Sequence, residues 1–403
     1  MSRFRNSLVY LDNAATTPVD ASIVRVMNRY HERYFYNPSA LYAEAVAVRG
    51  HIEGQRDELA RALGIGATGV TFTAGATEAN NMVIQGLVWK ARSEGNELPH
   101  IIMSATEHPS VRNTVRLLAK RNLAVYSELS VDEAGKVDVR ELRDAITPAT
   151  ILVTVHTINN ETGVIQPLKD IAKTIRWARK RHGHQYPLFH SDAAQAAAYY
   201  PLAMPQTGVD LLTLSSQKAY GPKGFGVIAR RQGVSLEVQS GGGGQEAGYR
   251  PGTEQVASII GGTMALVDAI ERRELETAAL TELRSWLVSG LRLVFPNLIL
   301  HGRDKAGEDQ SPHILSVTIP GLSAELLVIE LAERGILAAA RAACSADDTE
   351  PSHVLAAMYA HSQRYDDIIT TGAVRISMGK HTKKRDLKKA LKAFAHIKAK
   401  YDA

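Results

Sequence analysis

Lys218 is a residue whose position in the chain suggests chemistry. It lies in the stretch SSQKAYGPKG, between a short polar run and a glycine-rich turn, directly after the mostly apolar residues 209–214. Lysine is usually a surface residue. At the mouth of a buried strand its amine is desolvated, which lowers its pKa and makes it a nucleophile for carbonyl compounds. What such a lysine does depends on the groups that converge on it.

Two further stretches place chemical groups where strands end. In FTAGATEANN, a strand gives way to Ala76 and Thr77 and then to a helix, whose backbone N–H groups and Thr77 hydroxyl can bind an anion. The alternative is a plain helix cap by Thr77, with Glu78 in the first turn. In FHSDAAQ, Asp192 ends an apolar strand, where it either caps the next helix or holds a proton on a ring nitrogen.

An anion-binding turn, an aspartate and a lysine on successive strand ends fit one ligand, pyridoxal phosphate (PLP). Lysine forms a Schiff base with this cofactor, and an aspartate pairs with its pyridinium nitrogen. We therefore predict a PLP site that contains Lys218, Asp192 and the turn at Ala76 and Thr77.

The residue pattern predicts the elements that bring these groups together. Short β-rich runs alternate with helical stretches, a pattern typical of an α/β fold with a mostly parallel sheet and helices on both faces. Ligands of such sheets bind at the carboxyl ends of the strands. Strands are expected at residues 70–73, 100–104, 151–157, 187–192, 209–216 and 224–231.

The regular alternation of strands and helices ends after GGGGQ and RPGTEQ, which predicts a second, smaller domain. A long helical run at 256–294 is followed by short apolar runs and a basic helix. We expect a large cofactor-binding domain at residues 16–264, and a small α+β domain made of residues 1–15 and 265–403 that carries Cys344.

Composition excludes several classes of protein. The chain has 403 residues, of which 45% are hydrophobic, enough for a large core. Its one cysteine, Cys344, excludes an intramolecular disulfide and a multi-cysteine metal cluster within one chain, and we expect no metal site. We also expect no membrane span and no secretory segment, and a reducing cytoplasm as the location.

Positive charge is concentrated at the C-terminal end. From Lys380 onward the chain has nine Lys or Arg residues and two Asp. Apolar residues at Leu387, Leu391, Phe394 and Ile397 follow a helical period. We expect a surface helix with a solvated lysine face, and docking of a nucleic acid or an acidic partner is the alternative.

Ten motifs, in order along nearly the whole chain, resemble those of one enzyme family. They are YLDNAATTPVD, NPSA, FTAGATEANN, TEHPSV, NNETGVIQP, HSDAAQ, QKAYGPKGFG, GGGQEAGYRPGTE, ACSADDTEPSHVL and VRISMG. The chain resembles the cysteine desulfurases of the NifS/IscS type, which are PLP enzymes of the class V aminotransferase group. The resemblance implies fold type I, with a sheet of the seven-stranded type in the large domain, and a homodimer.

The resemblance also implies roles for the residues of these motifs. Lys218 forms the Schiff base, Asp192 bonds the pyridinium nitrogen, and His108 in TEHPS stacks on the cofactor ring and moves protons. Further cofactor contacts are expected from Ala76, Thr77, Ser215 and Gln217 at the phosphate, from Gln195 and Asn160 at the phenolic oxygen, and from Thr253 at the phosphate of the partner subunit.

The resemblance implies residues for the substrate and its sulfur as well. Arg375 in VRIS binds the substrate carboxylate in the two-pronged geometry that arginine favours, and Asn160 and Asn13 lie beside the substrate. Cys344 accepts the sulfur and becomes a persulfide. The chain is thus expected to convert L-cysteine to L-alanine and to pass the sulfur to an acceptor protein, for iron–sulfur cluster assembly or for thiolation of tRNA, DNA or a cofactor.

The chain departs from the family pattern at three places. Gln217 stands where relatives have histidine before the Schiff-base lysine; its amide can still donate to phosphate but does not titrate. Arg341 stands where a glycine is expected before the cysteine, so it should stiffen the loop and favour the thiolate. The tail that some relatives use to dock an iron–sulfur scaffold looks short, which leaves the acceptor open.

Two alternative functions stay open from the sequence. One is a selenocysteine lyase or another class V lyase or aminotransferase, which a cysteine in a family-like loop disfavours. The other is a sulfur-relay adaptor that acts mainly by binding a partner, which the basic C-terminal segment motivates. Salt-dependent retention of nucleic acid would support the adaptor.

Overall fold

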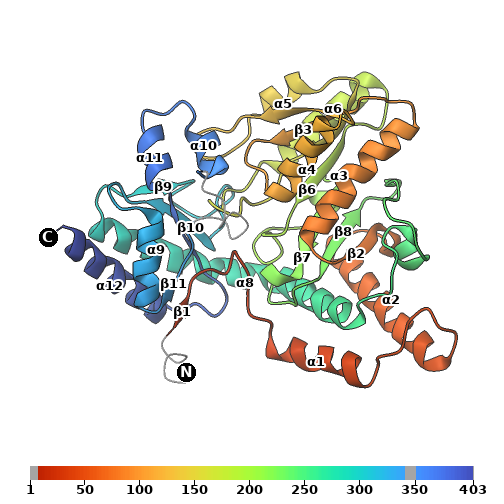
Figure 1. Cartoon of the computed structure of the whole chain (residues 1–403), viewed down its shortest axis with the longest axis horizontal. Helices are drawn as coiled ribbons and strands as arrows, with labels where there is room; N and C mark the ends of the chain where they lie inside the picture. Colours follow the sequence, from red (N-terminus) through yellow and green to blue (C-terminus); the bar gives the residue numbers. More distant parts are fainter. Residues whose placement is uncertain (1–7, 341–350, 403) are drawn as a thin grey trace.

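A seven-stranded sheet forms the centre of the larger part of the molecule (Figure 1). The computed structural model describes residues 8–340 and 351–402. The strand order is β2-β8-β7-β6-β5-β3-β4. The strands are β2 (Val70–Thr73), β3 (His100–Ser104), β4 (Val125–Leu129), β5 (Thr150–Thr154), β6 (Leu188–Asp192), β7 (Leu211–Ser215) and β8 (Gly226–Arg230). Neighbours from β7 to β4 are parallel, and only β8 runs against its neighbours. The predicted mostly parallel sheet is therefore confirmed.

Helices cover both faces of this sheet. Side chains of β3 alternate between two apolar clusters, with Ile101 and Met103 in one and Ile102 in the other. The first cluster packs under α3 (Ala76–Ser93) and α4 (Pro109–Lys120), and the second under α6 (Leu168–His182) and α8 (Val256–Val294). The remaining helices of this part are α1 (Ala21–Glu32), α2 (Ala43–Leu63), α5 (Val139–Ala145) and α7 (Met204–Thr207). Burial on both faces suits the inner strands β3, β5 and β7, whose residues are all buried, whereas the edge strand β4 is partly exposed.

A smaller α+β part is built from both ends of the chain. Its antiparallel sheet has the order β12-β10-β9, and β1 pairs in parallel with β11. The strands are β1 (Val9–Tyr10), β9 (Ile299–His301), β10 (Ile314–Thr318), β11 (Ile336–Leu337) and β12 (Val374–Ser377). The helices are α9 (Ala324–Glu333), α10 (His353–Tyr359), α11 (Tyr365–Thr371) and α12 (Lys384–Tyr401). Because α8 runs unbroken from one part to the other, a domain boundary at residue 264 stays a prediction (Figure 1).

The basic C-terminal helix α12 packs on the smaller part. It buries Leu387, Ala390, Phe394 and Ile397 against the core, and it contacts α8 and α9. Its lysines lie mostly at the surface, as expected for a helix that covers the smaller part. Within the described residues, no helix is long and apolar enough to cross a membrane.

Candidate active site

A cavity of about 430 Å³ opens at the carboxyl ends of β5, β6 and β7. This is the edge at which ligands of parallel sheets bind. It brings together ten of the predicted site residues: Ala76, Thr77, His108, Asn160, Asp192, Gln195, Ser215, Gln217, Lys218 and Arg375. These residues come from segments separated by up to three hundred positions in the chain, so their convergence supports the predicted site independently of the individual motifs.

Lys218 lies at the end of a single 3-10 turn directly after β7. Its Nζ donates a hydrogen bond to the carbonyl of Ala14, at 2.7 Å, and another to the carbonyl of Ala15. The N-terminal segment also holds the turn itself, because Thr17 Oγ1 donates to the Gln217 carbonyl at 3.0 Å and accepts from the Tyr220 N–H at 2.8 Å. The lysine is therefore directed across the cavity mouth by residues two hundred positions earlier.

Asp192 ends β6 as a buried carboxylate, with 8% of its surface exposed. Its Oδ2 accepts a hydrogen bond from Asn80 Nδ2 at 2.7 Å, and its Oδ1 accepts from the Ala194 N–H at 2.9 Å. The residues that follow form turns and not the α-helix considered in the sequence analysis, so Asp192 is not a helix cap. The two bonds fix the orientation of this carboxylate, which lines the cavity.

Gln195 is positioned by a histidine from the smaller part of the molecule. Its Nε2 donates to the Ala14 carbonyl at 2.8 Å, and its Oε1 lies 3.3 Å from His313 Nε2. Burial lowers the pKa of His313 to about 3, helped by the cations of Arg375 and Lys218, so the ring is neutral. Because Gln195 Oε1 can only accept, His313 Nε2 carries the proton and donates to it, and His313 Nδ1 is left to accept from Ser311 Oγ, which lies 2.5 Å away. The amide N–H groups of Gln195 are thereby turned away from His313.

The beginning of α3 supplies an anion-binding end to the cavity. Gly75 is the residue before the helix, and Thr77 lies inside the first turn, so the alternative of Thr77 as the helix cap is wrong. The N–H groups of a first helical turn have no intrahelical acceptors and point toward an anion. A Cβ on Gly226 would lie 2.4 Å from the carbonyl carbon of Gly75, so β8 approaches this turn as closely as only glycine permits.

Arg375 projects from β12 into the same cavity and is almost fully buried. Its Nη2 forms an ion pair with Asp12 Oδ1 at 2.8 Å, and its Nη1 donates to the Asn160 carbonyl at 2.9 Å. The guanidinium group therefore joins the N-terminal segment, the loop after β5 and the smaller sheet. A cation fixed at this place can bind the carboxylate of a small substrate.

Comparison with known proteins identifies the family. A model of the class-V aminotransferase family matches residues 9–390 of the chain. The cysteine desulfurase IscS of Dictyoglomus turgidum is 33% identical over 390 residues, which is 96% of this chain and 94% of that protein. The chain belongs to the cysteine desulfurases of the class-V aminotransferase family. This confirms the family predicted from the motifs, and it does not favour the lyase or the adaptor.

Solved structures of similar proteins agree with this assignment. A NifS-like protein is 30% identical and superposes with a TM-score of 0.86. The superposition covers 97% of this chain and 99% of that protein. SspA in complex with cysteine is 29% identical and gives a TM-score of 0.75. The superposition covers 93% of this chain and 99% of that protein. The predicted fold type I is therefore confirmed.

Three predicted site residues of the desulfurase are not in the cavity lining. Asn13 is buried beside it, and its Nδ2 donates to the Ser377 carbonyl at 2.9 Å. Thr253 is exposed on an irregular loop before α8. Cys344 lies outside the described residues, as does Arg341. In the N-terminal segment, the residues that line the cavity are Ala14 and Ala15, which follow Asn13 and were not predicted as site residues.

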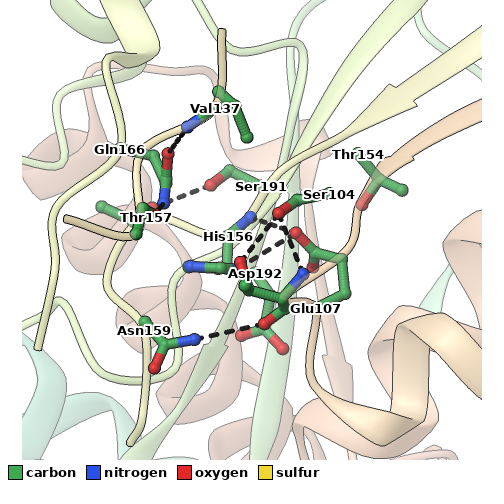
Figure 2. A network of polar contacts seen from close by, with 12 residues as sticks. Ser104, Glu107, Val137, Thr154, His156, Thr157, Asn159, Gln166, Ser191 and Asp192 are labelled. Carbon is green, nitrogen blue, oxygen red and sulfur yellow. Dashed lines mark hydrogen bonds and ion pairs between the residues drawn. The ribbon is translucent and has the colours of Figure 1, made fainter. Parts of the chain in front are cut away.

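A buried carboxylate and histidine of the desulfurase were also missed (Figure 2). Glu107 is fully buried, and its Oε1 accepts from the backbone N–H of His156 at 2.8 Å and lies 3.1 Å from His156 Nδ1. His156 follows β5 and lines the cavity. Because Glu107 holds Nδ1, the Nε2 atom is left as the group that this ring can offer to a ligand. The only sequence signal was that Glu107 directly precedes His108 in TEHPS.

Proposed function

We propose that this desulfurase converts L-cysteine to L-alanine with PLP held in the 430 Å³ cavity, and that Cys344 takes up the sulfur. The observation that carries the proposal is the cavity itself. It contains an amine from Lys218, a buried carboxylate from Asp192 and the amino end of α3. These are the three groups that a phosphorylated pyridine aldehyde requires.

The donor set fits this cofactor. Ala76, Thr77 and Ser215 would hold the phosphate, with Gln217 as a further donor, and Asp192 would pair with the ring nitrogen. Gln195 and Asn160 would face the phenolic oxygen, and His108 would stack on the ring. When bound, PLP supplies a sink for the electron pair left at the substrate Cα.

The residues of the chain supply the remaining steps. Arg375 binds the substrate carboxylate, and Lys218 takes the Cα proton at Nζ. The Cys344 thiolate then attacks the substrate sulfur, so that an S–S bond forms while the Cβ–S bond breaks. The electron pair of the broken bond stays with the carbon skeleton, which is protonated to alanine, and Cys344 keeps the sulfur as a persulfide.

The comparisons support cysteine as the substrate. The similar SspA was solved in complex with cysteine, and the similar chain from Dictyoglomus turgidum is a cysteine desulfurase IscS. We propose further that the enzyme is a homodimer in which Thr253, exposed in one subunit, reaches the phosphate of the other. A sulfur-acceptor protein then receives the persulfide sulfur.

Variants of the two reacting residues test the proposal. Purified protein incubated with L-cysteine should form alanine, and peptide mass mapping should find one extra sulfur on the peptide that contains Cys344. Lys218→Ala should abolish alanine formation. Lys223→Ala is the matched control, because Lys223 is an exposed lysine five positions along in the same loop. Cys344→Ser should retain the cofactor but lose alanine formation.

Two results would contradict the proposal. One is alanine formation by Lys218→Ala at the rate of Lys223→Ala, which would remove the lysine from the reaction. The other is wild-type protein that forms alanine with no sulfur on Cys344 while Cys344→Ser is fully active, which would indicate a lyase.

A further inference from the structure

A continuous chain of hydrogen bonds links Asp192 to His108. Asn80 on α3 donates from Nδ2 to Asp192 Oδ2 at 2.7 Å and to Ser110 Oγ at 2.8 Å. Ser110 Oγ in turn lies 2.8 Å from His108 Nδ1. Asn80 is fully buried and Ser110 is buried, so water does not compete for these groups. The chain connects two residues of the cavity through two residues that do not line it.

The carboxylate sets the direction of the first two bonds in this chain. An ionised carboxylate only accepts hydrogen bonds, so Asn80 must present its NH₂ group and not its carbonyl oxygen to Asp192. The second amide hydrogen then goes to Ser110 Oγ. Because this oxygen accepts from Asn80, the single hydroxyl hydrogen is available for His108 Nδ1.

A second donor points at the same ring nitrogen. His108 is the residue before α4, and its Nδ1 accepts the backbone N–H of Ser110 at 3.1 Å. A ring nitrogen has one lone pair in the ring plane, so an Nδ1 atom that accepts this backbone N–H cannot carry a proton of its own, and the Ser110 hydroxyl is then left to donate to it. The proton of the neutral ring must then be on Nε2, and an imidazolium would set its Nδ1–H against the backbone N–H of Ser110.

We propose that Asp192, through Asn80 and Ser110, fixes His108 as a neutral ring with its proton on Nε2. In this state the Nε2 atom can donate a hydrogen bond to the bound ligand but cannot act as a base toward it, which differs from the proton transfer that the family resemblance implies for His108. Asn80 and Ser110 are positioning residues that act through His108. The inference rests on the proposed function only for the identity of that ligand, and it leaves removal of the Cα proton to Lys218.

The tautomer can be measured directly by ¹⁵N NMR of the full-length, cofactor-bound protein, labelled on histidine, at neutral pH without cysteine. The His108 signals are assigned by their loss in His108→Gln. We expect Nδ1 to be unprotonated and Nε2 to be protonated. A proton on Nδ1, or an imidazolium, would overturn the proposal. The measurement involves no turnover, so the tautomer can be found wrong in a protein that is an active desulfurase. The tautomer can equally be found right in a protein that has no desulfurase activity.

Three variants test the chain that sets the tautomer. Ser110→Ala removes the hydroxyl donor, and the preference for Nε2–H should fall about fivefold, the weight of one ordinary hydrogen bond. Asp192→Asn lets the Asn80 amide turn over. His108 should then become a mixture of its two neutral tautomers, although it lies three hydrogen bonds away from residue 192. The matched control is Thr114→Val, since the Thr114 hydroxyl lies on the same helix, 2.8 Å from both Asn81 Oδ1 and the Ser110 carbonyl oxygen, and does not contact His108 Nδ1. An unchanged ratio in Ser110→Ala, or an equal change in Thr114→Val, would overturn the relay.

Discussion

The ion pair between Arg56 and Glu246 fixes the loop that precedes α8 to the large sheet. We expect Glu246→Gln to lower the free energy of unfolding of the protein strongly. The two side chains form a two-pronged pair, with Nη1–Oε2 and Nη2–Oε1 both at 2.8 Å. Glu246 Oε2 also accepts the backbone N–H of Phe72 at 2.8 Å. Each residue is only 9% exposed. Burial lowers the pKa of Arg56, but the hydrogen bonds and charge of Glu246 outweigh it and raise that pKa overall.

The expected loss of stability follows from these contacts. Removing one partner of a buried pair leaves a buried charge without its counter-charge, which costs about 3–5 kcal/mol. Arg56 keeps a second carboxylate, because its Nε lies 3.1 Å from Glu53 Oε2. The Glu53 side chain is 55% exposed, so solvent screens most of its attraction. We therefore expect the lower end, about 3 kcal/mol.

Guanidinium unfolding of the wild type and the variant, at one protein concentration, measures this loss. The matched control is Asp304→Asn, because Arg292 Nη2 contacts both oxygens of Asp304 at 2.9 Å while both side chains are about half exposed. Surface pairs of this kind contribute about 1 kcal/mol or less. If Glu246→Gln lowers the unfolding free energy no more than Asp304→Asn does, burial is not what gives the Arg56 pair its strength.

Three further predictions concern substrate, dimer and pH. Arg375→Ala should raise the KM for cysteine about tenfold to a hundredfold, the effect of losing a charge-assisted contact, and an unchanged KM would mean that another residue binds the carboxylate. Mixed dimers of Lys218→Ala and Thr253→Ala chains should recover about half of the activity if Thr253 acts on the partner's site, and none if it acts on its own. Burial lowers the pKa of His301 from 6.5 to about 3, so between these values the unfolded chain binds a proton that the folded chain does not. Stability should therefore fall as the pH drops below 6.5, by at most about 1.4 kcal/mol per pH unit from this residue, and His301→Gln should lessen that slope in unfolding measured at several pH values.

Six of the seven strands of the large sheet could be predicted from the sequence because their signal is local, whereas the edge strand β4, VYSEL, was missed because it is partly polar and partly exposed. Each central strand is a short apolar run, and the long helical run at 256–294 coincides with α8. The order of the strands, and the antiparallel position of β8 between β7 and β2, depend on contacts between distant segments and left no pattern in the sequence.

The hydrogen bonds between the polar side chains of the site could not be predicted for the same reason. Asn80 and Ser110 were quoted within motifs, but nothing in their spacing places both beside one another across two helices. Glu107 and His156 lie on separate strand ends, and their pairing exists only once β3 and β5 are adjacent. Hydrogen bonds between segments carry no periodicity, so a motif can indicate that a residue matters without indicating what it touches.

Arg375 illustrates this difference and resolves an apparent conflict in the site. The sequence predicted a guanidinium group that binds the substrate carboxylate, whereas the structure has it paired with Asp12 and with the Asn160 carbonyl. Those two contacts use one hydrogen on each Nη atom, and within the described residues Nε has no partner. A guanidinium group has five N–H hydrogens, so three remain, enough for a two-pronged contact with a carboxylate. Asp12 therefore orients the arginine without taking the place of the substrate, and its charge offsets the cost of burying that cation while the cavity is without a carboxylate.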